Sequence, residues 1–162
     1  MSKNDWRLGL ALAVATVVVA AVATPLAAAD RSASPFESDL DYCVAETNQY
    51  RALARRPALA RSALLEAYAA AAAPHDVKAR KTHKYFRRTK GGGGIAFAEN
   101  QLPGWPIPQF GSVREIVRVG LAMMWEEGRG GGHHDNIVGP YSQVGCGVYV
   151  HDDRVTLVQA FR

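Results

Sequence analysis

The hydrophobic positions of the chain begin with one uninterrupted apolar run. Residues 8–29 hold almost no polar groups, Lys3 and Arg7 precede them, and small residues close the run at Ala29. A basic region, an apolar region and a small-residue end are typical of a secretory signal peptide, so we predict cleavage after Ala29. The alternative is an uncleaved anchor helix, since the run is nearly long enough to span a bilayer. Pro25 and the small residues favour cleavage.

This interpretation divides the chain into three parts. They are a signal peptide over 1–29, a short linker over 30–36 and one domain over 37–162. The domain is long enough to bury a hydrophobic core of its own. Its expected location is secreted or periplasmic, because either form of the leading segment takes it out of the cytoplasm.

After the linker, two segments repeat apolar residues at the spacing of a helix. The first helix is predicted over 37–55 and ends before Pro57. The second is predicted after Ser62, a favourable N-cap residue, and Pro74 is expected to break or restart it. The predicted apolar faces contain Leu40, Cys43, Val44, Thr47, Tyr50 and Ala54 in the first helix, and Leu64, Leu65, Tyr68, Ala69 and Ala72 in the second.

A third helix is predicted over 112–127. Ser112 and Glu115 have the spacing of a capping box at its start. Gly128 and the glycines at 130–132 are expected to end it. Its apolar face contains Val113, Ile116, Val117, Gly120, Leu121 and Met124.

The last part of the chain alternates apolar and other residues as strands do. A strand is predicted around 144–150, a turn at Asp152 and Asp153, and a returning strand from Val155 to Phe161, which together make a hairpin. The segment 101–111 is rich in proline and glycine and is expected to be irregular. Helices first and strands last predict an α+β sandwich rather than parallel βαβ units.

Composition and charge narrow the function classes. Without residues 1–29, the chain keeps 17 basic and 14 acidic groups, a net charge of +3. That excess is too small to indicate an obligate nucleic-acid binder. The only cysteines are Cys43 and Cys146, which excludes a zinc site of four thiolates. The two either form a disulfide, as an exported protein allows, or remain buried packing thiols.

One short segment, residues 78–90, concentrates positive charge. We consider two interpretations: a solvated basic loop, or a surface that contacts anionic lipid, polysaccharide or nucleic acid. The glycines at 91–94 that follow lack the Lys-Ser/Thr of a phosphate-binding loop and are interpreted as a flexible connector. The basic residues are Lys78, Arg80, Lys81, Lys84, Arg87, Arg88 and Lys90.

Several common catalytic motifs are absent from the sequence. It contains no Gly-x-Ser-x-Gly elbow, no His-Glu-x-x-His helix and no Cys-x-x-Cys. Of the five histidines, His133 and His134 are adjacent in a glycine-rich stretch that we expect to be a surface turn. Neighbours on an extended segment point to opposite sides, so only one of them is expected to enter a given site.

The order of short motifs along residues 36–162 resembles one family. Asn48-Gln49-Tyr50-Arg51 is similar to its opening Asn-x-x-Arg helix motif, and Pro57-Ala58-Leu59 to the segment that follows. Further matches are Thr82-His83, Ala98-Glu99-Asn100, Met124-Trp125-Glu126-Glu127, Gly132-His133-His134-Asp135-Asn136-Ile137, Val144-Gly145-Cys146-Gly147-Val148 and Val158-Gln159-Ala160-Phe161. The family is the CAP superfamily of cysteine-rich secretory proteins, insect venom antigens and plant pathogenesis-related proteins, which has many bacterial members. Ala98 departs from the family's usual glycine.

This resemblance implies a fold and a site. The fold is a three-layer α-β-α sandwich with helices on both faces of an antiparallel sheet. The site is a cleft in which two histidines and two glutamates meet: His83, Glu99, Glu127 and His133. His75 competes with His83 for its role. Glu127 is expected in the cleft ahead of Glu126, since it follows Met124 by three residues on one helix face.

The resemblance also implies a function, and two hypotheses follow. The first is a secreted binding module for a small apolar ligand, an envelope component or a protein partner, with an anionic surface as a further partner class. His83 and His133 would hold a divalent metal, zinc first of all. The alternative is a metal-dependent hydrolase, which the lack of an apparent nucleophile disfavours. Nucleic acid is not an expected partner, and an enzyme is the less favoured class.

Overall fold

The computed structural model describes residues 34–162. The predicted signal peptide over 1–29 and most of the predicted linker over 30–36 lie outside these residues. No helix within the described range is long and apolar enough to cross a membrane.

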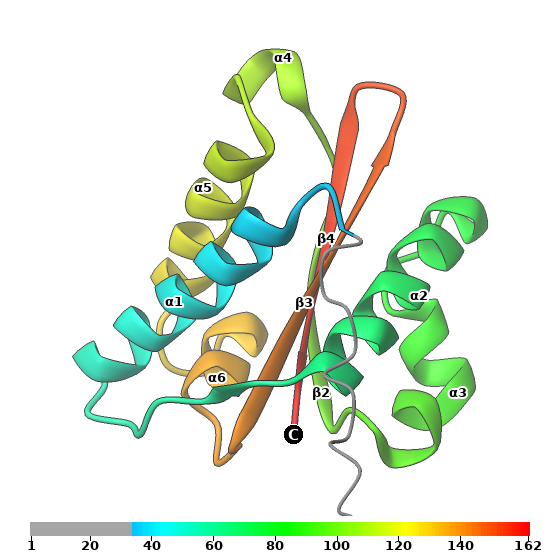
Figure 1. Ribbon diagram of the computed structural model, residues 1–162. Helices are drawn as coiled ribbons and strands as arrows, with labels where there is room; N and C mark the ends of the chain where they lie inside the picture. Colours follow the sequence, from blue (N-terminus) through cyan, green and yellow to red (C-terminus); the bar gives the residue numbers. More distant parts are fainter. Residues whose placement is uncertain (1–33) are drawn as a thin grey trace, which may run out of the picture. The chain divides into compact units, whose positions relative to one another are not determined.

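The described residues form a four-stranded sheet between two layers of helices (Figure 1). The strands are β1 (Ala60–Arg61), β2 (Ala98–Pro106), β3 (Gln143–His151) and β4 (Arg154–Phe161). Their order in the sheet is β1-β3-β4-β2. β4 is antiparallel to β2 and β3, whereas the short β1 is parallel to β3. The sheet is therefore antiparallel as expected, except at one edge.

The helices divide between the two faces of the sheet. One layer contains α1 (Glu37–Leu53), α4 (Ile107–Phe110), α5 (Val113–Glu126) and α6 (Gly132–Val138), and the other contains α2 (Ala63–Ala79) and α3 (Lys84–Gly94) (Figure 1). Two buried apolar clusters lie between sheet and helices. The larger, which includes Ile116, Leu121 and Phe161, faces α1 and α5, and the smaller, which includes Leu65 and Tyr68, faces α2 and α3. The α+β sandwich predicted from the sequence pattern is confirmed, and its three α-β-α layers are those that the family resemblance implies.

The predicted helix faces are largely confirmed. In α5, Ile116, Val117, Gly120, Leu121 and Met124 are all buried. Ser112 caps that helix through a bond from the Glu115 N–H, but the Glu115 side chain accepts from Arg118 instead of closing the capping box. Ser62 caps α2 as predicted.

Two predictions for α2 are wrong. Leu64 is exposed rather than on the buried face. Pro74 neither breaks nor restarts the helix, which continues to Ala79. Buried residues on both sides of the proline, Ala73 and Asp76, hold the two halves against the rest of the fold. Their packing offsets the one hydrogen bond that proline removes.

In residues 78–90 the basic residues are exposed as expected, but most of them belong to helices rather than to a loop, and the glycines at 91–94 are not an irregular connector. Most of the basic residues lie on the end of α2 and on α3, where Tyr85 and Phe86 pack against the smaller cluster. The glycines after them form a tight left-handed turn. Gly91 is buried with φ of 65°, and a Cβ there would lie 2.0 Å from the Ala96 carbonyl oxygen, so the turn requires glycine.

The segment 101–111 is ordered, contrary to expectation. It forms most of β2 and all of α4. Pro103 is accommodated because β2 is an edge strand and its pairing with β4 is irregular between Leu102 and Trp105. The predicted β3–β4 hairpin with its turn at Asp152 and Asp153 is confirmed.

A disulfide joins the helix α1 to the central part of the sheet. Cys43 and Cys146 are bonded to each other, so the structure contains the first of the two alternatives for these cysteines. Gly145 and Gly147 flank Cys146 and let α2 approach β3 closely. A Cβ at Gly147 would lie 2.5 Å from the backbone carbon of Ala69.

Candidate functional site

A buried hydrogen-bond network of amide and hydroxyl groups fixes the start of β2 relative to α6. Gln159 on β4 donates to Thr47 Oγ1 at 2.5 Å, and Asn100 donates to Gln159 Oε1 at 3.0 Å. Asn100 also accepts from Asn136 Nδ2 at 2.9 Å and donates to the His133 carbonyl oxygen at 3.1 Å. Because buried polar groups are costly unless paired, this satisfied network holds the strand and the short helix in one arrangement.

Glu99 on β2 makes the first of two histidine–carboxylate pairs. Its side chain is almost completely buried, and its Oε1 lies 2.9 Å from His83 Nδ1. The Tyr68 hydroxyl donates to the other oxygen at 3.4 Å. Burial first, and the Glu99 carboxylate second, raise the pKa of Tyr68 well above its ordinary value. Tyr68 therefore stays protonated and keeps its hydrogen for Glu99.

The backbone holds His83 in an unusual conformation. His83 has φ of 57°, in the left-handed region, and it directly precedes α3. Its N–H donates to Gln101 Oε1 at 2.9 Å. Two residues of one strand face, Glu99 and Gln101, thus hold the ring and the backbone of the same histidine.

Glu127 and His133 make the second pair. Glu127 Oε1 lies 2.5 Å from His133 Nδ1, and Oε2 accepts the His133 backbone N–H at 3.0 Å. The bond from the His133 ring, aided by that backbone bond, lowers the pKa of Glu127. The carboxylate lies at the N-terminus of α6, where the helix dipole also favours negative charge.

Both pairs line one cavity of about 580 Å³. His83 comes from the turn before α3, Glu99 from β2, Glu127 from the end of α5 and His133 from α6. Phe86, Arg87, Phe97 and Asn136 contribute to the same lining. Phe97 is 59% exposed, a large apolar side chain at the rim. The cavity therefore combines two polar pairs with an apolar border.

Comparison with known proteins identifies the fold around this cavity. The family model of the CAP, cysteine-rich secretory protein family matches residues 44–161, most of the chain. The chain belongs to the CAP family. Among solved structures, a cysteine-rich secretory protein from Staphylococcus aureus subsp. aureus Mu50 is similar, with a TM-score of 0.50 and 16% sequence identity. The match covers 77% of this chain and 38% of that one. No curated protein matches the chain.

The opening motif of this CAP domain, residues 48–51, connects α1 to two other segments of the fold. Asn48 accepts from the Leu59 N–H at 2.8 Å and donates to the Leu59 carbonyl oxygen at 3.0 Å, which fixes the segment between α1 and β1. Arg51 lies one turn further on and donates to the carbonyl oxygens of Ile137 and Gly139 at the end of α6. The sequence did not predict that Arg51 is buried.

Of the other candidates, only Arg87 from the basic segment lines this cavity. His134 packs against Trp125 with the rings tilted by 38° and their centroids 4.8 Å apart, and His134, Glu126 and His75 do not line the cavity. His133 and His134 do diverge, but the predicted cause is wrong: residues 132–138 are the helix α6 and not an extended turn. Adjacent residues on a helix point about 100° apart.

Both histidines of the CAP cavity bond to a carboxylate through the same ring nitrogen. Each histidine uses Nδ1 for a carboxylate, which leaves Nε2 as its second donor atom. This pattern is common around metal-bound histidines, where the carboxylate orients the ring. Within residues 34–162, no group of three or more His, Cys, Asp and Glu side chains is placed to hold a metal ion.

Sequence reasoning missed the residues that support the pairs. Tyr68, Asn100, Gln101 and Gln159 are buried and polar, and each bonds to a cavity residue or to a neighbour of one. The available signal was the presence of amides inside strands that are otherwise apolar.

Proposed function

We propose that this CAP domain is an exported binding module whose cavity captures a small ligand at a divalent metal ion. His83 and His133 would hold the ion through Nε2, and zinc is the expected metal because it binds imidazole well. The observation that supports this proposal is the pair of histidine–carboxylate contacts on one cavity. In this proposal, export uses the segment 1–29 as a cleaved signal peptide.

The roles within the pairs differ. Neutral imidazole is the ligating form, and Glu99 and Glu127 keep the hydrogen on Nδ1 so that Nε2 carries the free lone pair. Glu99 is buried beneath the cavity, whereas Glu127 is about one third exposed. The metal would supply a cationic point to which an oxygen or nitrogen of the ligand binds.

The lining suggests the chemistry of the ligand. A cavity of about 580 Å³ has the size of ordinary small-molecule sites. Phe86 and Phe97 give it an apolar border beside the polar pairs. We therefore expect a ligand with a metal-binding head and an apolar part.

Binding is favoured over the hydrolase alternative. None of the described side chains that line the cavity carries a hydroxyl or thiol group to act as a nucleophile. A hydrolase would rely on a metal-activated water, and its turnover would disappear with the metal ligands. Ester and peptide turnover by the zinc-loaded protein would overturn the preference for a binding module.

The metal proposal is tested by zinc titration of the metal-free protein with calorimetry. His83→Ala and His133→Ala should each weaken zinc binding by at least about tenfold, as expected for loss of one of two ligands. His134→Ala and His75→Ala are matched controls and should bind as the unmodified protein does. Equal zinc affinity in all four variants would refute the assignment.

Export is tested separately from the metal. Full-length protein expressed in a bacterium should be recovered from the periplasm or medium with Asp30 as its first residue, as measured by mass spectrometry. Recovery of the intact chain in the membrane fraction would instead support the uncleaved anchor.

A further inference from the structure

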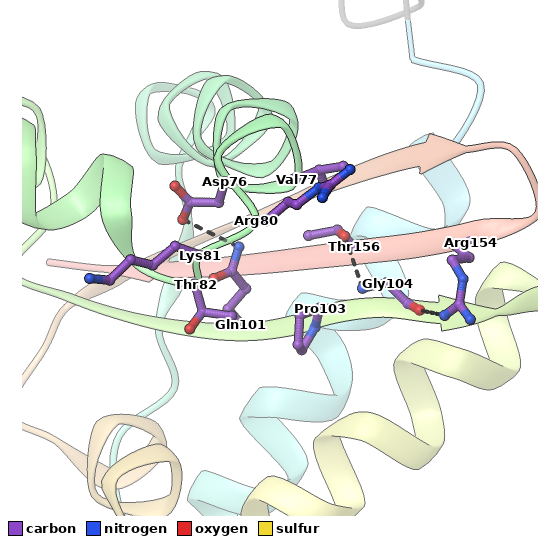
Figure 2. A pocket seen from close by; sticks show the side chains of 10 residues that line it. All are labelled: Asp76, Val77, Arg80, Lys81, Thr82, Gln101, Pro103, Gly104, Arg154 and Thr156. Carbon is purple, nitrogen blue, oxygen red and sulfur yellow. Dashed lines mark hydrogen bonds between the residues drawn. The ribbon is translucent and has the colours of Figure 1, made fainter.

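A second cavity, of about 540 Å³, lies between the C-terminal end of α2 and the strands β2 and β4 (Figure 2). It is separate from the histidine–glutamate cavity, although adjacent residues contribute to the two: Thr82 lines this one and His83 the other. Its lining is Asp76, Val77, Arg80, Lys81, Thr82, Gln101, Pro103, Gly104, Arg154 and Thr156.

The charge around this cavity is positive. Arg80 and Lys81 come from the end of α2, and Arg154 comes from β4. Asp76 is the one carboxylate in the lining, and its side chain is only 2% exposed. It accepts from the Tyr85 N–H at 2.7 Å and from Gln101 Nε2 at 3.4 Å, a bond drawn in Figure 2. The buried carboxylate is therefore occupied by internal donors.

The lysine and arginine side chains around this cavity form no ion pair. Over residues 34–162, Arg61, Arg114 and Arg118 pair with carboxylates, but no lysine or arginine from 78 to 90 does so, and neither does Arg154. Arg154 Nη1 donates to the Gly104 carbonyl oxygen, which holds the guanidinium group beside Gly104 in the lining (Figure 2). Its other guanidinium N–H groups remain available to a ligand.

The other lining groups complement an anion. The carbonyl oxygens of Asp76 and Val77 at the end of α2 accept from the backbone N–H groups of Lys81 and Arg80, so they do not face the cavity unpaired. Thr156 Oγ1 accepts from the Gly104 N–H at 3.0 Å, which leaves its hydroxyl hydrogen to donate. Val77 and Pro103 add apolar surface.

We propose that this cavity binds a small phosphate-bearing ligand. The phosphate contacts Arg80 and Arg154, and the rest of the ligand lies against Val77 and Pro103. Arginine suits this role because its planar guanidinium can donate two parallel hydrogen bonds to phosphate oxygens. Lys81 extends away from Arg154 in Figure 2, so it contributes charge at the rim rather than a direct contact. The proposal does not depend on a metal in the other cavity.

The test is a titration of ¹⁵N-labelled protein with glycerol 3-phosphate, followed by NMR amide shifts. Saturable shifts at Lys81, Thr82, Gly104 and Arg154 are expected. Arg80→Gln and Arg154→Gln should each weaken binding about tenfold, the loss expected for one charge-assisted contact. Lys90→Gln, which removes a basic group outside the cavity, should leave the affinity unchanged.

Two further measurements keep the result unambiguous. Thermal unfolding of each variant shows whether it is folded. If Arg154→Gln does not fold, the affinity of Arg80→Gln alone decides the test, because Arg80 is exposed and only caps the end of the helix. Vesicles of phosphatidylglycerol and of phosphatidylcholine distinguish the source of the phosphate. A lipid headgroup is supported if the protein sediments only with phosphatidylglycerol vesicles and Arg80→Gln no longer does so. A soluble ligand is supported if the protein binds glycerol 3-phosphate but neither kind of vesicle.

The proposal is overturned by either of two results. One is the absence of saturable shifts with glycerol 3-phosphate together with no binding to phosphatidylglycerol vesicles. The other is a loss in Lys90→Gln equal to that in Arg80→Gln, because diffuse charge attraction would then explain the binding.

Discussion

Arg51 Nη1 donates to the carbonyl oxygen of Ile137 at 2.6 Å and so joins α1 to the last turn of α6. The same atom donates to Gly139 at 3.0 Å, and Nε donates to Pro57 at 2.8 Å. Arg51 is 1% exposed. Burial, aided by repulsion from Arg56, lowers the pKa of Arg51 from its ordinary value. The charge stays stabilised by carbonyl oxygens at the negative end of the α6 dipole.

Replacing Arg51 with methionine should destabilise the domain by about 2–4 kcal/mol. Methionine keeps much of the apolar stem but leaves three carbonyl oxygens without their donor, and two of them, those of Ile137 and Gly139, are in buried contacts. Urea unfolding measures the change. Arg56→Met, at an exposed neighbour, is the control and should shift stability by less than about 0.5 kcal/mol. Equal stability of Arg51→Met and the unmodified protein would contradict the role assigned to the guanidinium.

Leu121→Ala should cost about 2–5 kcal/mol, because Leu121 is fully buried between α5 and the sheet. Met123, two residues away on the same helix, is 51% exposed, and Met123→Ala should have a much smaller effect. Both values come from denaturant midpoints at constant slope. A change below about 0.5 kcal/mol in Leu121→Ala would mean that α5 is peripheral to the core.

Reduction of the Cys43–Cys146 disulfide should lower stability by up to about 4–5 kcal/mol, since the bridge closes a long loop of the unfolded chain. The oxidised protein should show no thiol reactive to a probe, even after unfolding without reductant. The double variant Cys43→Ala with Cys146→Ala serves as the comparison. Two thiols that react on unfolding alone would show that the purified protein lacks the bridge.

Glu127 should make the stability of the metal-free protein depend on acid pH. Its pKa is lower in the folded protein than the ordinary value of 4.5. Its contribution is therefore fully present above about pH 4.5 and is lost as the pH falls through the folded-state value. The effect is modest and weakens in salt, because the side chain is one third exposed. Stability profiles from pH 3 to 7 measure it.

Glu127→Gln should flatten that acid limb, and Glu126→Gln should not, since Glu126 does not line the cavity. Parallel profiles for the unmodified protein and Glu127→Gln would show that the His133 contact does not stabilise the folded state.

The sequence predicted the secondary structure correctly wherever a segment has one clear hydrophobic periodicity. The α5 stripe ending at Met124 and the β3–β4 alternation are strong local signals, and each matches the structure. The prediction from sequence was wrong where tertiary contacts override the local conformational preference of a residue. Pro74 stays inside a helix because its neighbours are buried, and Pro103 stays in a strand because that strand is at an edge.

The residues of the candidate site could be predicted from the sequence, but their detailed contacts could not. His83, Glu99, Glu127 and His133 were selected by resemblance to short motifs, and the structure places all four on one cavity. Which histidine nitrogen each carboxylate would engage could not be predicted, because it depends on the φ of His83 and on the helical start of α6. For the second cavity, the basic segment 78–90 already indicated Arg80 and Lys81, but nothing in the sequence connects them with Arg154, which β4 brings to the same cavity.

The strand order β1-β3-β4-β2 has a consequence for how fast the domain acquires its structure. The β3–β4 hairpin is local, but β1 pairs Ala60 with Gln143 and β2 pairs Ala98 with Phe161. Residues so far apart along the chain must lose loop-closure entropy before their contacts stabilise the fold. Proteins with such topologies are slow two-state folders, with folding times of about milliseconds to seconds. We expect the hairpin to be the earliest part of the sheet, and the Ala98–Phe161 pairing to be absent from the rate-limiting transition state.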